Sequence, residues 1–171
     1  FEFRPGEIVL DIDVAGLNAF TALQGGIESL TTFSWGVVTD IQTQWIKSLT
    51  VFQGQNAFDF LPDLTLTDTG PNGTSLAKAK VLTGVAGAWS AASGFGALSF
   101  HNLSGELTSP QSIDSLKTDH IEGALIDVSG RIESLTTEYW DGGSLEAAEL
   151  KKLYVNGNPS FGSGKLLNTT F

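Results

Sequence analysis

The sequence predicts a mainly β protein, built as a two-sheet β-barrel or sandwich, with one short helix at about 75–83 and a C-terminal helix at about 144–154. One observation is a repeat, because the hexapeptide Ile-Glu-Ser-Leu-Thr-Thr occurs at residues 27–32 and again at 132–137. Both copies are rich in β-branched residues and lie near glycines, which is typical of strands. A second observation is the alternation over residues 8–14, where every other side chain is aliphatic, as in a half-buried strand. We therefore expect the two hexapeptides to form equivalent strands of one β-rich domain.

Further strands are expected along residues 1–142, which should form the β-barrel domain. Small residues dominate 85–96, which predicts a loop anchored by Trp89. Gly130 lies inside a long strand pattern, and a glycine in that position predicts a bulge or a sharp bend. The alternating or β-branched runs that predict these further strands occur at 37–52, 64–67, 97–101, 103–107 and 121–137.

Two segments carry helix signals. Thr74 or Ser75 can cap a helix that continues over helix-favouring residues to Gly84, whose left-handed conformation would end it. Ser144 can cap the second helix. Residues 143–171 are therefore expected to form a C-terminal helix followed by an extended tail.

The composition argues against several classes of partner. The 171 residues include nine lysines and arginines and carry a formal net charge of −10, whereas nucleic acids and anionic membranes bind dense cationic surfaces. No apolar run approaches the roughly 18 residues that a membrane-spanning helix needs. We expect neither nucleic-acid binding nor membrane insertion.

The residues that are missing bear on where the protein works. There is no cysteine, so packing and hydrogen bonds must stabilise the fold without disulfides. There is also no methionine, which removal of a signal peptide would explain. This predicts an extracellular or cell-surface protein, with assembly in the cytoplasm followed by secretion, or a truncated chain, as alternatives.

The residues that could carry chemistry form no recognisable motif. His101 and His120 can be drawn as metal ligands with Asp119 and Glu122, but their spacing matches no metal-binding motif, and surface histidines are the simpler interpretation. The chain has no nucleophile elbow and no glycine-rich phosphate loop. We expect no catalytic residues, no cofactor and no metal site.

Two features bear on surface modification and ligand binding. Sequons place N-glycosylation candidates at Asn72, Asn102 and Asn168. Exposed tryptophans could bind a carbohydrate ligand, but packing in a core or interface is the favoured interpretation. The four tryptophans are Trp35, Trp45, Trp89 and Trp140.

The order of the strand and helix signals gives a family resemblance. A strand pattern at 9–13 is followed by a glycine, a loop and the tetrapeptide Phe-Ser-Trp-Gly at 33–36. A strand pattern at 63–67 then leads into the helix signal at 74–79. The last two strand patterns follow at 98–107 and 126–139. Over roughly residues 8–140 this order resembles the Hcp tube proteins of bacterial type VI secretion, which share their fold with phage tail-tube proteins. The resemblance implies a β-barrel and a subunit that assembles into a ring or tube.

We therefore expect a non-enzymatic structural subunit that forms a homo-oligomeric ring, tube or filament. The alternative is a monomeric secreted or cell-surface module that binds a carbohydrate or protein ligand. Apolar residues near the two ends could dock on a neighbouring subunit by adding a strand to its sheet. These candidate assembly contacts are Phe1, Phe3, Phe161, Leu166, Leu167 and Phe171.

Overall fold

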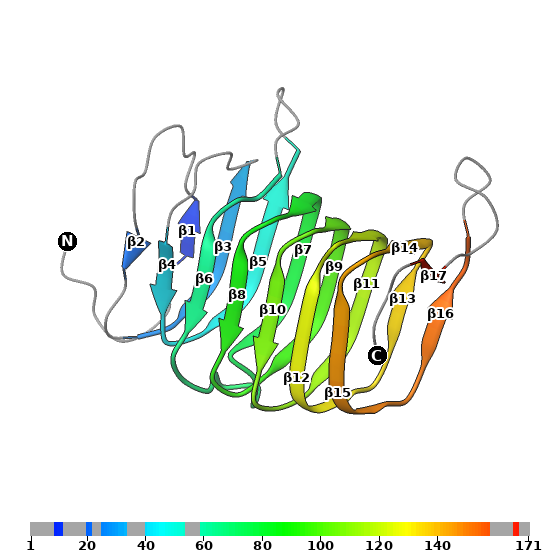
Figure 1. The fold of residues 1–171 in the computed structure, drawn as a ribbon. Coiled ribbons are helices and arrows are strands. Elements are labelled where there is room, and N and C mark those ends of the chain that lie inside the picture. The colour runs from blue at the N-terminus through cyan, green and yellow to red at the C-terminus, as the bar shows by residue number, and fades with distance from the viewer. Residues whose placement is uncertain are drawn as a thin grey trace.

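The protein is a parallel β-solenoid, in which the chain winds in successive coils that stack along one axis (Figure 1). The structure is a computed structural model that describes residues 9–11, 20–21, 25–33, 40–53, 59–157 and 166–167. It contains 17 strands, and their pairings are parallel. The described residues form no helix, so none of them belongs to a helix that could cross a membrane.

Two stacks of parallel strands form the long walls of the solenoid (Figure 1). The first sheet contains β3 (Ile27–Phe33), β5 (Ile46–Phe52), β7 (Leu76–Val85), β9 (Phe95–Leu103), β11 (Ile113–Glu122) and β13 (Leu135–Thr137). The second sheet contains β4 (Asp40–Thr43), β6 (Asp63–Leu66), β8 (Ala88–Ala91), β10 (Glu106–Ser109), β12 (Leu125–Ile132) and β15 (Ser144–Leu150). Shorter strands complete the first and last coils, namely β1 (Val9–Asp11), β2 (Phe20–Thr21), β14 (Tyr139–Asp141), β16 (Leu153–Val155) and β17 (Leu166–Leu167).

The strand register gives the length of a coil. Leu76 lies beside Phe95, Phe95 beside Ile113 and Ile113 beside Ile132, so each of these coils takes 18 or 19 residues. The coil that joins β5 to β7 is longer, because Ile46 lies beside Leu76 and 30 residues separate them. The extra residues of this longer coil therefore form an insertion, and the strands on either side of it remain in register.

The core consists of columns of inward side chains, one from each coil. One column runs from Leu30 through Leu49, Ala79, Leu98 and Leu116 to Leu135, and all six side chains are buried. The two sheets meet across this core where Trp89 of β8 packs edge-on against Phe100 of β9, with ring centroids 5.2 Å apart. Burial of such continuous aliphatic and aromatic columns is the main stabilising contribution to the fold.

The predicted barrel or sandwich is wrong. Period-two alternation is the same in a barrel, a sandwich and a solenoid, since all three bury one face of each strand. What separates them is the partner of each strand: here β5 pairs with β7 and β7 with β9, one coil further on, and the pairs are parallel. The sequence repeat of 18 or 19 residues is degenerate, since only the inward positions recur and the longer coil before Leu76 interrupts the period.

The helix predicted at 75–83 is also wrong, because this segment forms β7. Leu76, Ala79 and Val81 point inward and are buried, while Lys78 and Lys80 are exposed, which is the pattern of a strand. β7 pairs with β5 on one side and β9 on the other, and these strands supply the backbone hydrogen bonds that a helix would form internally. This tertiary context overrides the helix propensity of Ala and Lys.

The C-terminal helix predicted at 144–154 is replaced by two strands. β15 pairs with β12 and β16 pairs with β13, and Lys151 and Lys152 lie between them. Leu145 is buried, whereas Tyr154 is 52% exposed. The loop predicted at 85–96 is likewise wrong, because it contains β8, although its anchor Trp89 is fully buried.

Two sequence expectations are confirmed. The hexapeptide copies occupy equivalent positions, since Ile27 and Ile132 belong to one inward column and Leu30 and Leu135 to another. The register between β12 and β15 also shifts around Gly130, as the glycine in the strand pattern predicts. The bend lies at a corner of the solenoid.

Candidate functional site

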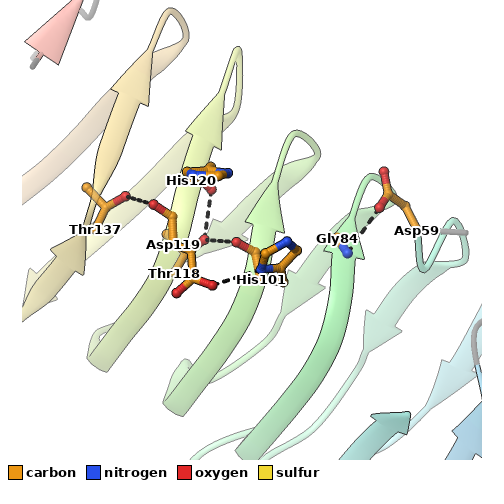
Figure 2. A network of polar contacts seen from close by, with 7 residues as sticks. All are labelled: Asp59, Gly84, His101, Thr118, Asp119, His120 and Thr137. Atoms are coloured by element: carbon orange, nitrogen blue, oxygen red, sulfur yellow. Dashed lines mark hydrogen bonds and ion pairs between the residues drawn. The ribbon is translucent and has the colours of Figure 1, made fainter. Parts of the chain in front are cut away.

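A polar cluster lies toward the C-terminal ends of β9 and β11 in the first sheet (Figure 2). His101 of β9 and Asp119 of β11 lie on adjacent coils, and His101 Nδ1 is 2.8 Å from Asp119 Oδ2. The two side chains are 58% and 44% exposed. A polar contact that is this exposed contributes little to the stability of the fold.

Buried threonines fix the backbone beneath this pair. Thr118 Oγ1 lies 2.8 Å from His120 O and 3.3 Å from His101 O, and Thr137 Oγ1 lies 2.9 Å from Tyr139 O and 3.2 Å from Asp119 O. Each hydroxyl thus donates to carbonyl groups of its own coil and the preceding coil, which satisfies a buried polar group. Figure 2 shows the contacts of Thr118 with His101 and of Thr137 with Asp119, which join neighbouring coils.

Two shallow hollows flank His101. One has a volume of about 210 Å³ and is lined by Ser99, Lys117 and Asp119 among others. The other, of about 350 Å³, is lined by Gln53, Asp59 and Leu82 among others. Asp59 Oδ1 accepts a hydrogen bond from the Gly84 N–H at 3.0 Å, which ties the long insertion to β7 (Figure 2).

The cluster has few of the groups that catalysis needs. His101 contacts Asp119, and Ser99 lines the same hollow, but no hydrogen bond joins Ser99 to His101 in the described structure. The His120 ring lies 5.9 Å from the His101 ring, yet among the described residues no three His, Cys, Asp or Glu side chains are placed to hold one metal ion. The arrangement is that of a polar surface cluster.

A second hollow region lies on the outward face of the second sheet. This groove of about 310 Å³ is lined by Asp40, Gln42, Asp63, Thr65, Ala88, Trp89, Ser90, Glu106 and Thr108. Asp63 Oδ1 accepts from the Ala88 N–H at 2.7 Å, and Glu106 Oε1 accepts from Thr108 Oγ1 at 2.9 Å. The groove therefore presents carboxylates and hydroxyls on a rigid, evenly spaced strand array.

Two ionisable groups near the last coils have shifted pKa values. A hydrogen bond from Lys151, aided by the Arg131 charge, lowers the pKa of Glu133. Since the folded-state pKa is lowered, the pair stabilises the fold above the unfolded-state pKa, and this contribution is lost as pH falls through the folded-state pKa. Desolvation and the neighbouring Asp141 raise the pKa of Tyr139.

The predicted glycosylation candidates have different surroundings. Asn72 lies exposed in the turn that follows β6, where a glycan would meet no obstacle. Asn102 lies within β9 between Gly84 and His120, and its Oδ1 atom is buried without a hydrogen-bond partner in the described part of the chain. Asn168 lies outside the described residues.

The candidate assembly contacts near the two ends are described only in part. Leu166 and Leu167 form β17, which pairs with Trp140 and Asp141 of the same chain. Phe1, Phe3, Phe161 and Phe171 lie outside the described residues.

Three of the tryptophans can be placed. Trp89 and Trp140 are fully buried, as the core-packing interpretation expects. Trp45 is half-buried, and its ring covers Gly26 so closely that a Cβ there would lie 1.8 Å from it. Trp35 lies outside the described residues.

Sequence reasoning missed the groove on the second sheet. Its signal is the spacing of acidic residues two positions before a polar one, in Asp-Ile-Gln, Asp-Leu-Thr and Glu-Leu-Thr at the starts of β4, β6 and β10. Without the coil register these three short segments cannot be recognised as neighbours.

Comparison with protein-family models, with curated proteins and with solved structures gave no match. The resemblance to the Hcp tube proteins is tested by none of these comparisons and stays a prediction.

Proposed function

We propose that this chain is a non-enzymatic structural segment that joins head to tail with further copies of itself into a filament of stacked coils. The observation that carries the proposal is the incomplete burial of the last coil. Ala147, Leu150 and Leu153 continue the inward columns but are only partly buried, whereas their column neighbours Val128, Ile132 and Leu135 are fully buried. An additional coil on this end would bury the three side chains and extend the columns.

The backbone at this end also favours another coil. In the described part of the chain β15 pairs with β12 and β16 with β13, and neither strand has a partner on its other edge. Unpaired edges of parallel strands bind further strands readily. β1 and β2, at the opposite end, each pair with one strand, β3 and β4.

A contact between two different ends has a defined consequence for assembly. Such a head-to-tail interface is heterologous, and it generates an open filament unless the rotation between copies closes a ring. The coil spacing along the axis is constant, so a copy added at the end continues the solenoid in the same direction. A structural role of this kind requires no catalytic group.

The test is a lysine substitution at the last coil. Leu153→Lys places a charge among the half-buried end residues, where it can still reach solvent, but it opposes docking of an apolar coil. We expect the unmodified chain to sediment as concentration-dependent oligomers at micromolar concentration and to form filaments in electron micrographs. At about 0.5 M NaCl, Leu153→Lys should sediment as a monomer with an unchanged circular dichroism spectrum, and the unmodified chain should still assemble.

Tyr154→Lys is the matched control, because Tyr154 is the next residue on the same strand and its side chain is 52% exposed. This variant should assemble like the unmodified chain. A monomeric unmodified chain, or filaments that form equally well in the Leu153→Lys variant, would contradict the proposal.

A further inference from the structure

Outward positions of β4, β6 and β10 in the second sheet carry carboxylates. In the first sheet, β7 carries two outward lysines, and β11 carries Lys117 together with Asp114 and Asp119. Outward positions of β4, β6 and β10 hold Asp40, Asp63 and Glu106, and the strands β4, β6, β8 and β10 contain no lysine or arginine. We call these three carboxylates and the groove between them the acidic face. The lysine face is the opposite wall, where Lys78 and Lys80 of β7 and Lys117 of β11 are exposed.

The charges on the two faces have the same spacing along the solenoid axis. On the acidic face, Ala88 separates Asp63 from Glu106 in one column of neighbouring coils. On the lysine face, Ser99 separates Lys80 from Lys117 in the same manner. Since adjacent parallel strands are about 4.8 Å apart, the members of each pair are about 9.6 Å apart along the axis.

The shapes of the two faces are also complementary. The groove of about 310 Å³ lies where the small residues Ala88 and Ser90 separate longer side chains on either side. Hydroxyl groups of Thr65 and Thr108 line the same groove and can accept hydrogen bonds from an ammonium group. A lysine side chain has the length and the three donors to occupy it.

Neither set of charges forms an ion pair among the described residues. Lys78, Lys80 and Lys117 form no ion pair in the described structure, in contrast to Lys47, which pairs with Glu28 at 2.5 Å. Asp40 lies directly beside Asp63 in neighbouring strands, and like charges in such positions repel each other. Asp119, two residues after Lys117, is the nearest carboxylate in the chain order of β11. It lines the same hollow as Lys117 and contacts His101, and it forms no ion pair with a lysine in the described structure. A cationic surface against the acidic face would relieve this repulsion.

From this complementarity we propose that the acidic face of one copy binds the lysine face of a second copy, so that solenoids associate side by side. The contact pairs Lys80 and Lys117 of one copy with the two carboxylates at Asp63 and Glu106 of the next. Because the two faces lie on opposite walls, a bound pair of copies presents one free acidic face and one free lysine face, and the association continues as a layer. This lateral contact uses none of the residues of the end-to-end contact.

The experiment uses the full chain with Leu153→Lys, which removes the end-to-end contact and leaves the lateral contact to be measured alone. In this background we expect weak association by sedimentation velocity at low salt that disappears at about 0.5 M NaCl, where screening is strong. Lys80→Glu with Lys117→Glu should weaken association by about tenfold or more, because two attractive pairs become repulsive. Asp63→Lys with Glu106→Lys should weaken it equally.

The decisive variant combines all four substitutions. It exchanges the charges of the two faces and keeps the net charge of the parent, so association should return to within about threefold of the parent value. Asp63→Asn with Glu106→Gln is a milder alternative that keeps an acceptor for the Ala88 N–H, and it should weaken association without altering the circular dichroism spectrum. A monomeric parent at low salt, unchanged association in the Lys80 and Lys117 variant, or a quadruple variant that stays dissociated would each overturn the proposal.

Discussion

At the scale of single residues, glycines allow one coil to pass close to the next. Gly123 and Gly143 both have a positive φ, of 68° and 82°. A Cβ on Gly143 would lie 2.1 Å from the carbonyl oxygen of Ala124 in the preceding coil, whereas a Cβ on Gly123 would meet nothing within 4 Å. A substitution at Gly123 therefore introduces backbone strain alone, whereas one at Gly143 introduces backbone strain and a clash with the preceding coil.

This difference predicts unequal effects of alanine. Gly123→Ala should lower the free energy of unfolding by about 1–2 kcal/mol, the cost of the left-handed conformation for a residue with a Cβ. Gly143→Ala should lower it by more, since the backbone at Ala124 must also move. Urea denaturation measures both values, and equal losses would show that the close approach at Gly143 is unimportant.

At the scale of strands, the hexapeptide repeat marks positions where a leucine is required. Leu30 is 2% exposed and Leu135 is fully buried, and both belong to one inward column. Replacing either by alanine should lower the free energy of unfolding by about 2–4 kcal/mol, through lost burial and the cavity left behind.

Leu82 supplies the control for this prediction, because it lies on β7 but is 40% exposed. Leu82→Ala should change the free energy of unfolding by about 0.5 kcal/mol or less. Thermal or urea denaturation of the three variants gives the comparison. A small loss at Leu30 alongside a large one at Leu135 would mean that the two strands are equivalent in register but not in packing.

Only some of the strands could be predicted from the sequence, and their partners could not. The hexapeptides and the bend at Gly130 depend on local patterns, and both predictions are confirmed. The segment at 75–83 was ambiguous, because Ala and Lys favour a helix and only pairing with β5 and β9 makes it a strand. The acidic and lysine faces were missed for the same reason, since only the coil register places Asp63 and Glu106 in one column, on either side of Ala88.

At the scale of the whole molecule, the solenoid repeats the same strand pairing from coil to coil around a core that extends along its axis. β9 pairs with β7 and β11, so its backbone has a partner strand on each side. In such stacked proteins stability is close to a sum over coils and the contacts between neighbours. The proposed end-to-end and lateral contacts therefore act on different parts of the molecule, one on the last coil and one on the walls.

This one-dimensional arrangement predicts a gradient of local stability, which hydrogen exchange with mass spectrometry can measure. In the 171-residue chain kept monomeric by dilution, amides of β9 and β11 should exchange most slowly. Amides of β15 should exchange faster, because β15 pairs with β12 alone in the described structure and its own Leu150 is only partly buried.

Raising the protein concentration should slow exchange in β15 and leave β9 unchanged, since a second copy docked on the last coil would pair the free edge of β15. Leu153→Lys, which blocks that contact, should keep exchange in β15 fast at every concentration. If β15 were as protected as β9 in the dilute monomer, its free edge would be closed within the chain, and the end-to-end contact would have no strand to pair with.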